Sequence, residues 1–302
     1  MPDRRGRAVR YAGQIGEHIW SRLPESFLPS RPVRALGRAI HRHYARHQNR
    51  VQSHYTWFLR NRPQLEALAA RLDLRPGSGP LKIASIGCST GAELYSALWV
   101  IRRHHPSMAV DGYGIDVSEG VVEAARAGRY DRHASASVAG CFEAGTPEVE
   151  HLPEDLIQSL FIVEGDSLTV RDWVRAGTSW LVADVLEVHL ARIIGQQDGV
   201  LANNLLGPME DDAAEACLHR IVALVKAGGF LVLDGVDLDL KVRVVNALGL
   251  WPLADRLDEI WTSDPSKGGW PWVRWAHEPV DRGRADWLSR YSTLFQVGGD
   301  SP

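Results

Sequence analysis

The chain has 302 residues, 45% hydrophobic and 24% charged, with a formal net charge of −3, which is typical of a globular protein with one large α/β domain and a small accessory region, or with two modest domains. Its three cysteines are widely spaced and form no C-x-x-C pair, which argues against a disulfide framework or a structural zinc site and suits a reducing, cytoplasmic compartment. No uncharged apolar run reaches the ~18 residues that span a bilayer, and the arginine-rich start lacks the apolar segment of a secretory signal, so we expect no membrane association.

The first 62 residues form a basic region that differs from the rest of the chain. They contain 13 Arg, no Lys and 3 acidic residues, whereas the remaining 240 residues carry 21 basic and 34 acidic groups. Two interpretations stay open: the region docks on the acidic remainder of its own chain, which we favour, or it binds an anionic ligand. We expect no nucleic acid, and an acidic partner is the external ligand that we retain.

Residues 1–74 are predicted to be a helical region, because Leu65, Leu68, Ala69 and Leu72 follow helical spacing. A cluster of helix breakers at residues 75–80 predicts a boundary, after which residues 81–302 form the main domain. There, short apolar runs predict strands over residues 82–86, 109–115, 177–183, 199–202 and 230–233. Helical patterns predict helices over residues 92–104, 119–127 and 210–226, the last of them stopped by two glycines at 228–229. This alternation predicts βαβ units and a mostly parallel sheet.

The segment of residues 128–176 is too long for a simple loop between a helix and a strand, so we expect an inserted subdomain. Its pattern predicts a helix over residues 153–160 and a hairpin of residues 161–163 and 167–170, with the turn at 165–166.

A glycine-rich turn at residues 86–93, Ile-Gly-Cys-Ser-Thr-Gly-Ala-Glu, follows a predicted strand and opens a predicted helix. Such a turn lets a ligand approach the backbone and offers N–H groups at the helix N-terminus. It is neither the G-x-G-x-x-G of a dinucleotide fold nor a P-loop with its phosphate-binding lysine. Taken alone, it is equally consistent with a tight turn that binds nothing.

Two acidic residues stand at the ends of predicted strands. Asp116 ends the second strand, where a carboxylate can accept both ribose hydroxyls of an adenosine, and Asp184 ends the third, where it can accept from an adenine amino group. Each alone could simply cap a turn. Together with the glycine turn they predict an adenosine site without phosphate-binding groups, which favours S-adenosylmethionine as the cofactor.

Several motifs in the same order resemble those of the CheR-type chemotaxis-receptor methyltransferases, a class I family that uses S-adenosylmethionine. The family's T-x-F-F-R is similar to residues 56–60 (Thr-Trp-Phe-Leu-Arg), and its S-T-G-E-E-P-Y-S to residues 89–96 (Ser-Thr-Gly-Ala-Glu-Leu-Tyr-Ser). Its D-I-D and A-R-x-G-x-Y motifs are similar to residues 115–117 and 125–130. The resemblance covers about residues 55–236. It implies a Rossmann-like, mostly parallel sheet of seven strands with a small N-terminal helical region and a small inserted β-subdomain.

The resemblance also implies roles for individual residues. Thr56 and Arg60, which we expect on one face of a helix, would hold the carboxylate of the methionine moiety, and Glu93 would receive its ammonium group. Without the motif, Arg60 would be one more solvated charge of the basic region. The expected cofactor contacts are Thr56, Arg60, Gly87, Cys88, Ser89, Gly91, Glu93, Asp116, Val117, Asp184, Val185 and Asn203, and the expected substrate contacts are Asn204 and Trp57.

On the acceptor side the chain departs from the family. The motif R-N-V-x-x-Y-F reads Asn-Asn-Leu-Leu-Gly-Pro-Met at residues 203–209, so that Asn203 replaces Arg and Pro208 replaces Tyr. This departure puts methylation of a chemoreceptor glutamate in doubt. Asn203 and Asn204 either orient a polar acceptor or only form a turn after the strand.

The C-terminal part is rich in tryptophan, with six between residues 251 and 287. They serve packing or, alternatively, form a wall for an apolar acceptor. Residues 272–275 are expected to add a terminal strand to the sheet.

These features predict a methyltransferase that transfers a methyl group from S-adenosylmethionine to an oxygen or nitrogen atom of a small metabolite or of a protein side chain. Two alternatives stay open: a protein-glutamate O-methyltransferase of the CheR type, and a non-catalytic adaptor that binds S-adenosylmethionine. We name no catalytic base, since methyl transfer depends mainly on alignment of the acceptor.

Overall fold

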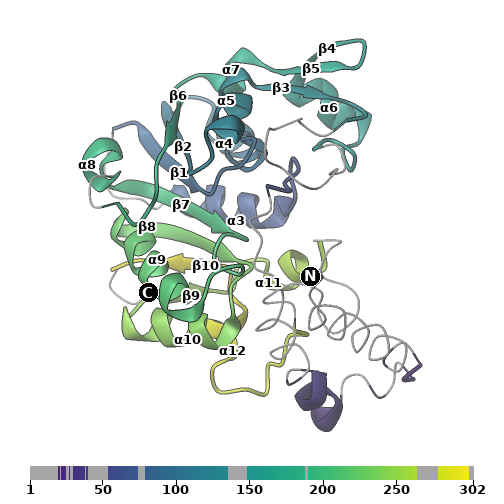
Figure 1. Cartoon of the computed structure of the whole chain (residues 1–302), viewed down its shortest axis with the longest axis vertical. Coiled ribbons are helices and arrows are strands. Elements are labelled where there is room, and N and C mark those ends of the chain that lie inside the picture. The colour runs from purple at the N-terminus through teal and green to yellow at the C-terminus, as the bar shows by residue number, and fades with distance from the viewer. Residues whose placement is uncertain are drawn as a thin grey trace, which may run out of the picture.

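The computed structural model describes residues 20, 22–24, 27, 30–37, 39, 54–73, 79–134, 148–187, 190–263 and 278–298. These residues build a seven-stranded sheet in the order β6-β2-β1-β7-β8-β10-β9 (Figure 1). All pairs from β6 to β8 are parallel, and β10 is antiparallel to both of its neighbours, which confirms the expected mostly parallel, Rossmann-like sheet. The strands are β1 (Leu81–Ile86), β2 (Val110–Asp116), β6 (Thr178–Val182), β7 (Gln197–Asn203), β8 (Val225–Asp234), β9 (Trp251–Leu253) and β10 (Leu294–Gln296).

The direction in which strands are added reverses between β1 and β7. From β1 the chain continues to β2 and β6 on one side, and it then returns to place β7 and β8 on the other. In open α/β sheets such a reversal leaves a crevice at the carboxyl ends of the strands, and ligands bind there. The glycine turn after β1 and the asparagines after β7 therefore lie at the same edge.

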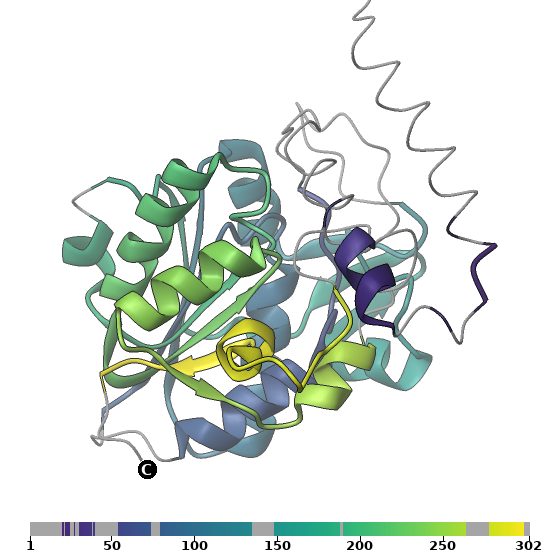
Figure 2. The ribbon, with the colours of Figure 1, turned by 90° about the horizontal axis from the view of Figure 1, so that it is seen from below.

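Helices cover both faces of the sheet (Figures 1 and 2). One apolar core joins α3 (Arg62–Leu72), α4 (Ala92–His104) and α5 (Glu119–Ala127) to alternate residues of the strands. The other core joins α8 (Leu190–Ile194), α9 (Asp211–Ala223) and α10 (Leu238–Ala247). None of the helices within the described residues is both long and apolar enough to cross a membrane.

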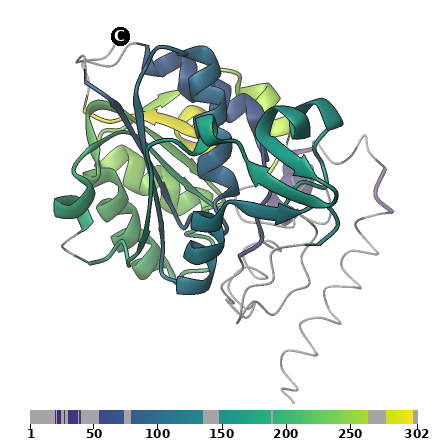
Figure 3. The same ribbon diagram turned by 90° about the horizontal axis from the view of Figure 1, so that it is seen from above.

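The predicted inserted subdomain is present, set to one side of the main sheet (Figure 3). It consists of a three-stranded antiparallel sheet in the order β3-β5-β4, together with α6 (Glu154–Leu160) and α7 (Asp172–Arg175). The hairpin of β4 (Phe161–Glu164) and β5 (Ser167–Val170) matches the expectation. β3 (Arg129–Asp131) was not predicted, because its three residues form a strand only by pairing with β5.

Residues 54–61 correct one expectation, since they are not helical and α3 begins only at Arg62. Leu59 has a φ of 52°, which a right-handed helix does not allow. Its N–H donates to Oγ of Ser96 at 2.8 Å, and the N–H of Phe58 donates to the carbonyl of Glu148 at 2.8 Å. Tertiary hydrogen bonds thus replace helical ones, and Thr56 and Arg60 do not share a helix face. In the basic region before residue 54 the structure describes a helical stretch at residues 31–37 and a few other positions.

A second correction concerns the two glycines at 228–229. They do not end the preceding helix: α9 already ends at Ala223, and β8 runs through both glycines. The register between β7 and β8 shifts between Gln197 and Gly199, which marks a bulge. Gly228 has a φ of 78°, and a Cβ at Gly229 would lie 3.0 Å from the carbonyl oxygen of Asp198. The two glycines therefore allow the backbone conformation and the close backbone approach that the bulge requires.

At the C-terminal end, β9 and β10 complete the sheet. α12 (Trp287–Tyr291) packs against β9, and α11 (Leu257–Ser263) packs against α3. The strand expected at residues 272–275 lies outside the described residues. Trp261 packs against the ring of Tyr291 at 5.4 Å between centroids, and its indole N–H donates to the carbonyl of Tyr291 at 2.8 Å. This tryptophan serves packing.

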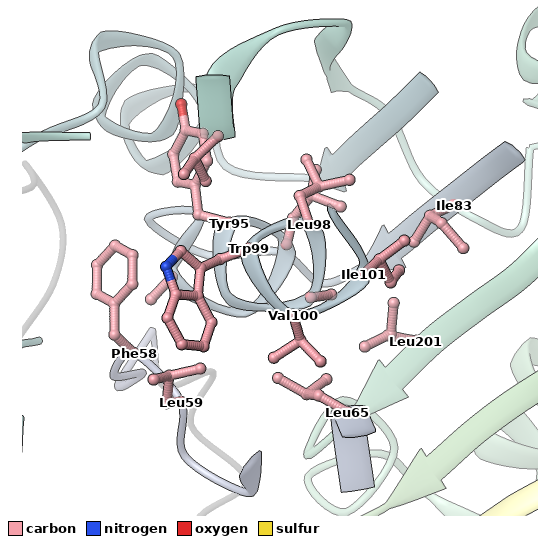
Figure 4. Close-up of a cluster of buried hydrophobic side chains, with 14 of the residues drawn as sticks. Phe58, Leu59, Leu65, Ile83, Tyr95, Leu98, Trp99, Val100, Ile101 and Leu201 are labelled. Carbon is pink, nitrogen blue, oxygen red and sulfur yellow. The ribbon is translucent and has the colours of Figure 1, made fainter. Parts of the chain in front are cut away.

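Residues 54–73 are held to the sheet by a shared apolar core. Figure 4 shows Phe58 and Leu59 beside Tyr95 and Trp99 of α4. Phe58 is 1% exposed, and complete burial of such a side chain contributes about 1.5–3 kcal/mol. Its ring also meets Phe161 of the inserted subdomain at 4.8 Å. This part of the basic region is thereby fixed against both the sheet and the insert.

The close packing of Trp180 on β2 yields a test of the fold. A Cβ at Gly114 would collide with the Trp180 ring, so Gly114→Ala is expected to destabilise the protein by about 1–3 kcal/mol. This should appear as a lower urea midpoint with an unchanged slope. Gly79→Ala is the control, because a Cβ there meets no atom within 4 Å. If Gly114→Ala unfolded at the wild-type midpoint, the described packing would be wrong.

Candidate functional site

The glycine turn after β1 is held firmly to β2. Gly87 and Gly91 adopt φ values of 69° and 91°, and Ser89 adopts 49°, a region that favours glycine. The N–H groups of Gly87 and Cys88 donate to the carbonyl of Ile115 at 2.8 and 3.0 Å. These two N–H groups are therefore already used within the protein. The turn can still let a ligand lie close to its backbone, but it does not offer these two donors.

Asp116, at the end of β2, organises this turn. Its carboxylate accepts from the backbone N–H of Ser89 at 2.9 Å and from that of Ser118 at 3.1 Å. An ionised carboxylate has about four lone-pair positions, so capacity for two hydroxyl donors remains. Beside it Val117 and Val182 are each 51% exposed, and Val182 pairs with Asp116 across the strands. A carboxylate beside an exposed apolar surface fits the ribose and the base of an adenosine.

Glu93, in the first turn of α4, presents a second carboxylate. Its Oε2 accepts from Oγ of Ser85 at 2.6 Å, and its Oε1 accepts from Nδ2 of Asn203 at 2.8 Å. Burial raises the pKa of Glu93, and the hydrogen bonds from Ser85 and Asn203 and the charge of Arg60 oppose that rise. Each oxygen keeps lone-pair capacity, so the ionised carboxylate can accept from an ammonium group.

Arg60 supplies a cation near the same edge. Its guanidinium carbon lies 4.1 Å from the centroid of the Trp57 ring, and its Nη2 donates to Oδ1 of Asn204 at 3.5 Å. Trp57 is only 5% exposed and also meets the rings of Tyr55 and His151, at 5.1 and 5.8 Å. Trp57 therefore acts as a platform for Arg60 and offers little free surface of its own. Thr56, one residue before Trp57, is half-buried in the irregular stretch that precedes α3.

Asp184 and Val185 lie beyond β6. Oδ1 of Asp184 accepts from the N–H of Leu186 at 2.9 Å, which is the local turn contact that the sequence left open. Val185 is buried in the core on the α9 face. Burial raises the pKa of Cys217 to about 12, and the charge of Asp184 adds to the rise. A contact of Asp184 with adenine stays a prediction.

Cys88 is a packing residue. Its side chain is 1% exposed, and burial raises the pKa of its thiol well above the ordinary value, with the charges of Asp116 and Glu93 adding to the effect. The thiol is therefore protonated near neutral pH, and Cys88 can offer a ligand only an apolar wall and its backbone.

Four residues of this region were missed by sequence reasoning. Ser85 was detectable, since it is a polar residue within an otherwise apolar strand. His54 accepts through its carbonyl from Oγ of Ser89 at 2.6 Å. Gln64 and Trp180 carried no signal, because Gln64 is placed by α3 and the Trp180 ring lies over two glycines distant in sequence, Gly91 and Gly114. No group of His, Cys, Asp or Glu side chains among the described residues could hold a metal ion.

The chain is similar to known methyltransferases. The family model of the CheR methyltransferase, SAM binding domain, matches residues 54–238. A sequence search of curated proteins found no match.

Three similar solved structures are enzymes of this chemistry. Magnesium protoporphyrin IX methyltransferase (ChlM) from Synechocystis PCC 6803 with bound SAM has a TM-score of 0.34 and 14% identity, over 64% of this chain and 71% of that one. The plantazolicin methyltransferase BpumL in complex with SAH has a TM-score of 0.34 and 12% identity, over 80% and 66%. The N-methyltransferase NodS from Bradyrhizobium japonicum WM9 in complex with SAH has a TM-score of 0.32 and 17% identity, over 58% and 62%. The chain thus spans roughly two thirds of the length of these proteins.

Proposed function

The chain belongs to the CheR methyltransferase family and carries its S-adenosylmethionine-binding domain, and from this premise we propose that it methylates an oxygen or nitrogen atom of a small metabolite. The observation that carries the choice of acceptor is the neutral side chain of Asn203, which is already hydrogen-bonded within the protein. This residue stands where the family has an arginine, and its amide is directed at Glu93 and Gln64. The position therefore presents no positive charge to a carboxylate acceptor.

We assign the cofactor contacts as follows. Arg60 and Thr56 hold the methionine carboxylate, and Glu93 receives the ammonium group. Asp116 accepts from the ribose hydroxyls. Val117 and Asp184 contact the adenine, and Val185 contributes through its backbone. The turn residues Gly87, Cys88, Ser89 and Gly91 shape the floor of the site, and Asn203 supports Glu93. The charges support this assignment. A cationic and an anionic side chain lie at the same edge of the sheet, and the amino-acid end of the cofactor carries the two opposite charges.

When bound, S-adenosylmethionine supplies a methyl group already activated by its sulfonium, so this chain has to align the acceptor and exclude water. Asn204, with a φ of 58° at the end of β7, is half-buried beside Arg60. We assign it to the acceptor side, where Trp57, 5% exposed, contributes as the platform that holds Arg60. The amide of Asn204 can donate to or accept from a polar acceptor. We assign no catalytic base.

Glutamate methylation is the second candidate, and family membership is the observation that favours it. The two candidates differ in their products. Transfer of a radiolabelled methyl group from S-adenosylmethionine should be followed in a cell extract that is separated into small molecules and proteins. We expect label among the small molecules. Label in protein that alkali releases as methanol would mark a carboxyl methyl ester and would overturn the small-metabolite assignment. Cofactor binding without transfer to either fraction would favour a non-catalytic adaptor.

The role of Asp116 can be tested by calorimetry with S-adenosylhomocysteine. Asp116→Ala removes the acceptor of two ribose hydroxyls and loosens Ser89, so we expect an affinity at least about 10-fold lower, the equivalent of about 1.4 kcal/mol or more. The exposed Asp155→Ala in α6 is the control and should bind like the wild type. Equal affinity of Asp116→Ala and wild type would remove Asp116 from the site.

A further inference from the structure

We propose that Gln64 is a positioning residue for the amino-acid end of the cofactor, and that it acts by holding the amide of Asn203 in the orientation that donates to Glu93. The inference rests on the proposed function, because it concerns the residue that receives the ammonium group. Gln64 belongs to α3, which carries none of the other assigned contacts.

Hydrogen bonds join three side chains in a row, namely Gln64, Asn203 and Glu93. Gln64 is 2% exposed, and its Oε1 accepts from Nδ2 of Asn203 at 2.9 Å. The same Nδ2 donates to Oε1 of Glu93 at 2.8 Å. A primary amide nitrogen carries two hydrogens, so both hydrogens of Asn203 are used. Its oxygen, Oδ1, is thereby turned away from the Glu93 carboxylate.

This orientation matters because an asparagine side chain can present either end. If the amide of Asn203 were reversed, Oδ1 would face two acceptor oxygens, one of Gln64 and one of Glu93. Glu93 would lose one of its two observed side-chain donors and would keep only Ser85. Reversing Asn203 would therefore also require Gln64 to turn its own amide, and Gln64 as observed supports the orientation that supplies the Glu93 carboxylate with a donor.

Burial of two polar atoms in this row is costly. Nε2 of Gln64 and Oδ1 of Asn203 are buried and have no hydrogen-bond partner within the described part of the chain. Buried unpaired polar atoms are uncommon and costly, and those that persist call for a specific cause. The cost of these two atoms indicates that the row serves a purpose other than stability.

Packing alone does not require a glutamine at this position. Leu65, Leu68 and Leu72 of α3 are buried in the shared core and anchor the helix. Asn61, one turn earlier, is a second buried amide, and its Nδ2 donates to the carbonyl of Ile260 in α11 at 3.1 Å. Asn61 thus has a packing role away from Glu93, which makes it the matched control.

The test compares two ligands that differ only in the amino-acid end. S-adenosylhomocysteine carries it, and 5′-methylthioadenosine keeps the adenosine and the thioether but lacks it. Calorimetry with the full chain should show about 10-fold weaker binding of S-adenosylhomocysteine to Gln64→Met, as the loss of one hydrogen bond to a charged group implies. Binding of 5′-methylthioadenosine should be unchanged. A purely structural role would move both ligands together.

A second variant of Gln64 and a control variant of Asn61 complete the test. Gln64→Asn retains a buried amide but withdraws its oxygen by one methylene, and it should show the same selective loss; if Gln64→Met does not fold, this variant decides. Asn61→Ala should lower the thermal midpoint and leave both affinities unaltered. An equal loss for both ligands, or no loss for either, would overturn the role of Gln64. Failure of the wild type to bind S-adenosylhomocysteine would instead overturn the proposed function.

Discussion

The carboxylate of Glu93 has hydrogen-bond donors from two strands that lie on either side of the reversal in the sheet. Ser85 reaches it from β1 and Asn203 from β7, at 2.6 and 2.8 Å. A buried charge is costly unless it is paired and hydrogen-bonded, and each donor that is lost would raise the pKa of Glu93 further. Strands β1 and β7 and helix α4 are therefore linked at this edge through the one carboxylate, and the amide of Gln64 adds α3 to the same row of hydrogen bonds.

A second constraint brings residues 54–61 of the basic region to the edge where the sheet reverses. Residues 54–61 form no regular structure, and they are placed by what they contact. Phe58 and Leu59 are buried against α4, and their N–H groups donate to the carbonyl of Glu148 and to Oγ of Ser96. Arg60 follows directly and lies over Trp57. The cation of the proposed site thus depends on burial of its neighbours and on the inserted subdomain, which supplies Glu148.

Elements determined by local signals were predictable from the sequence. The bounds of α4 and α5 match the expectation, because a glycine in the left-handed region stands at one end of each: Gly91 before α4 and Gly128 after α5. Asp116 and the glycine turn were found through their position after strands. What failed depended on distant partners. The irregular stretch before α3 follows from tertiary hydrogen bonds, the bulge of β8 follows from its register with β7, and β3 exists only through its pairing with β5.

The same distinction applies to the site. Sequence motifs indicate which residues lie at the edge of the sheet, but they do not show how an amide is turned or which carbonyl a turn has already used. Asn203 was considered as a ligand for the acceptor or the cofactor, and the structure directs its amide to Glu93 and Gln64. The charge pattern that results, with Glu93 and Arg60 at the reversal and Asp116 at the end of β2, is what gives the proposed cofactor assignment its physical basis.

The role of Glu93 in binding the ammonium group is tested most directly by the affinity for S-adenosylhomocysteine as a function of pH, measured for the wild type and for Glu93→Gln. Because the ammonium group of the ligand needs an ionised Glu93, wild-type affinity should fall as the pH is lowered through the raised pKa of this carboxyl. Glu93→Gln should bind about 10-fold more weakly or worse at neutral pH and should lack that acidic decline. A Glu93→Gln variant with the affinity and the pH profile of the wild type would contradict the account.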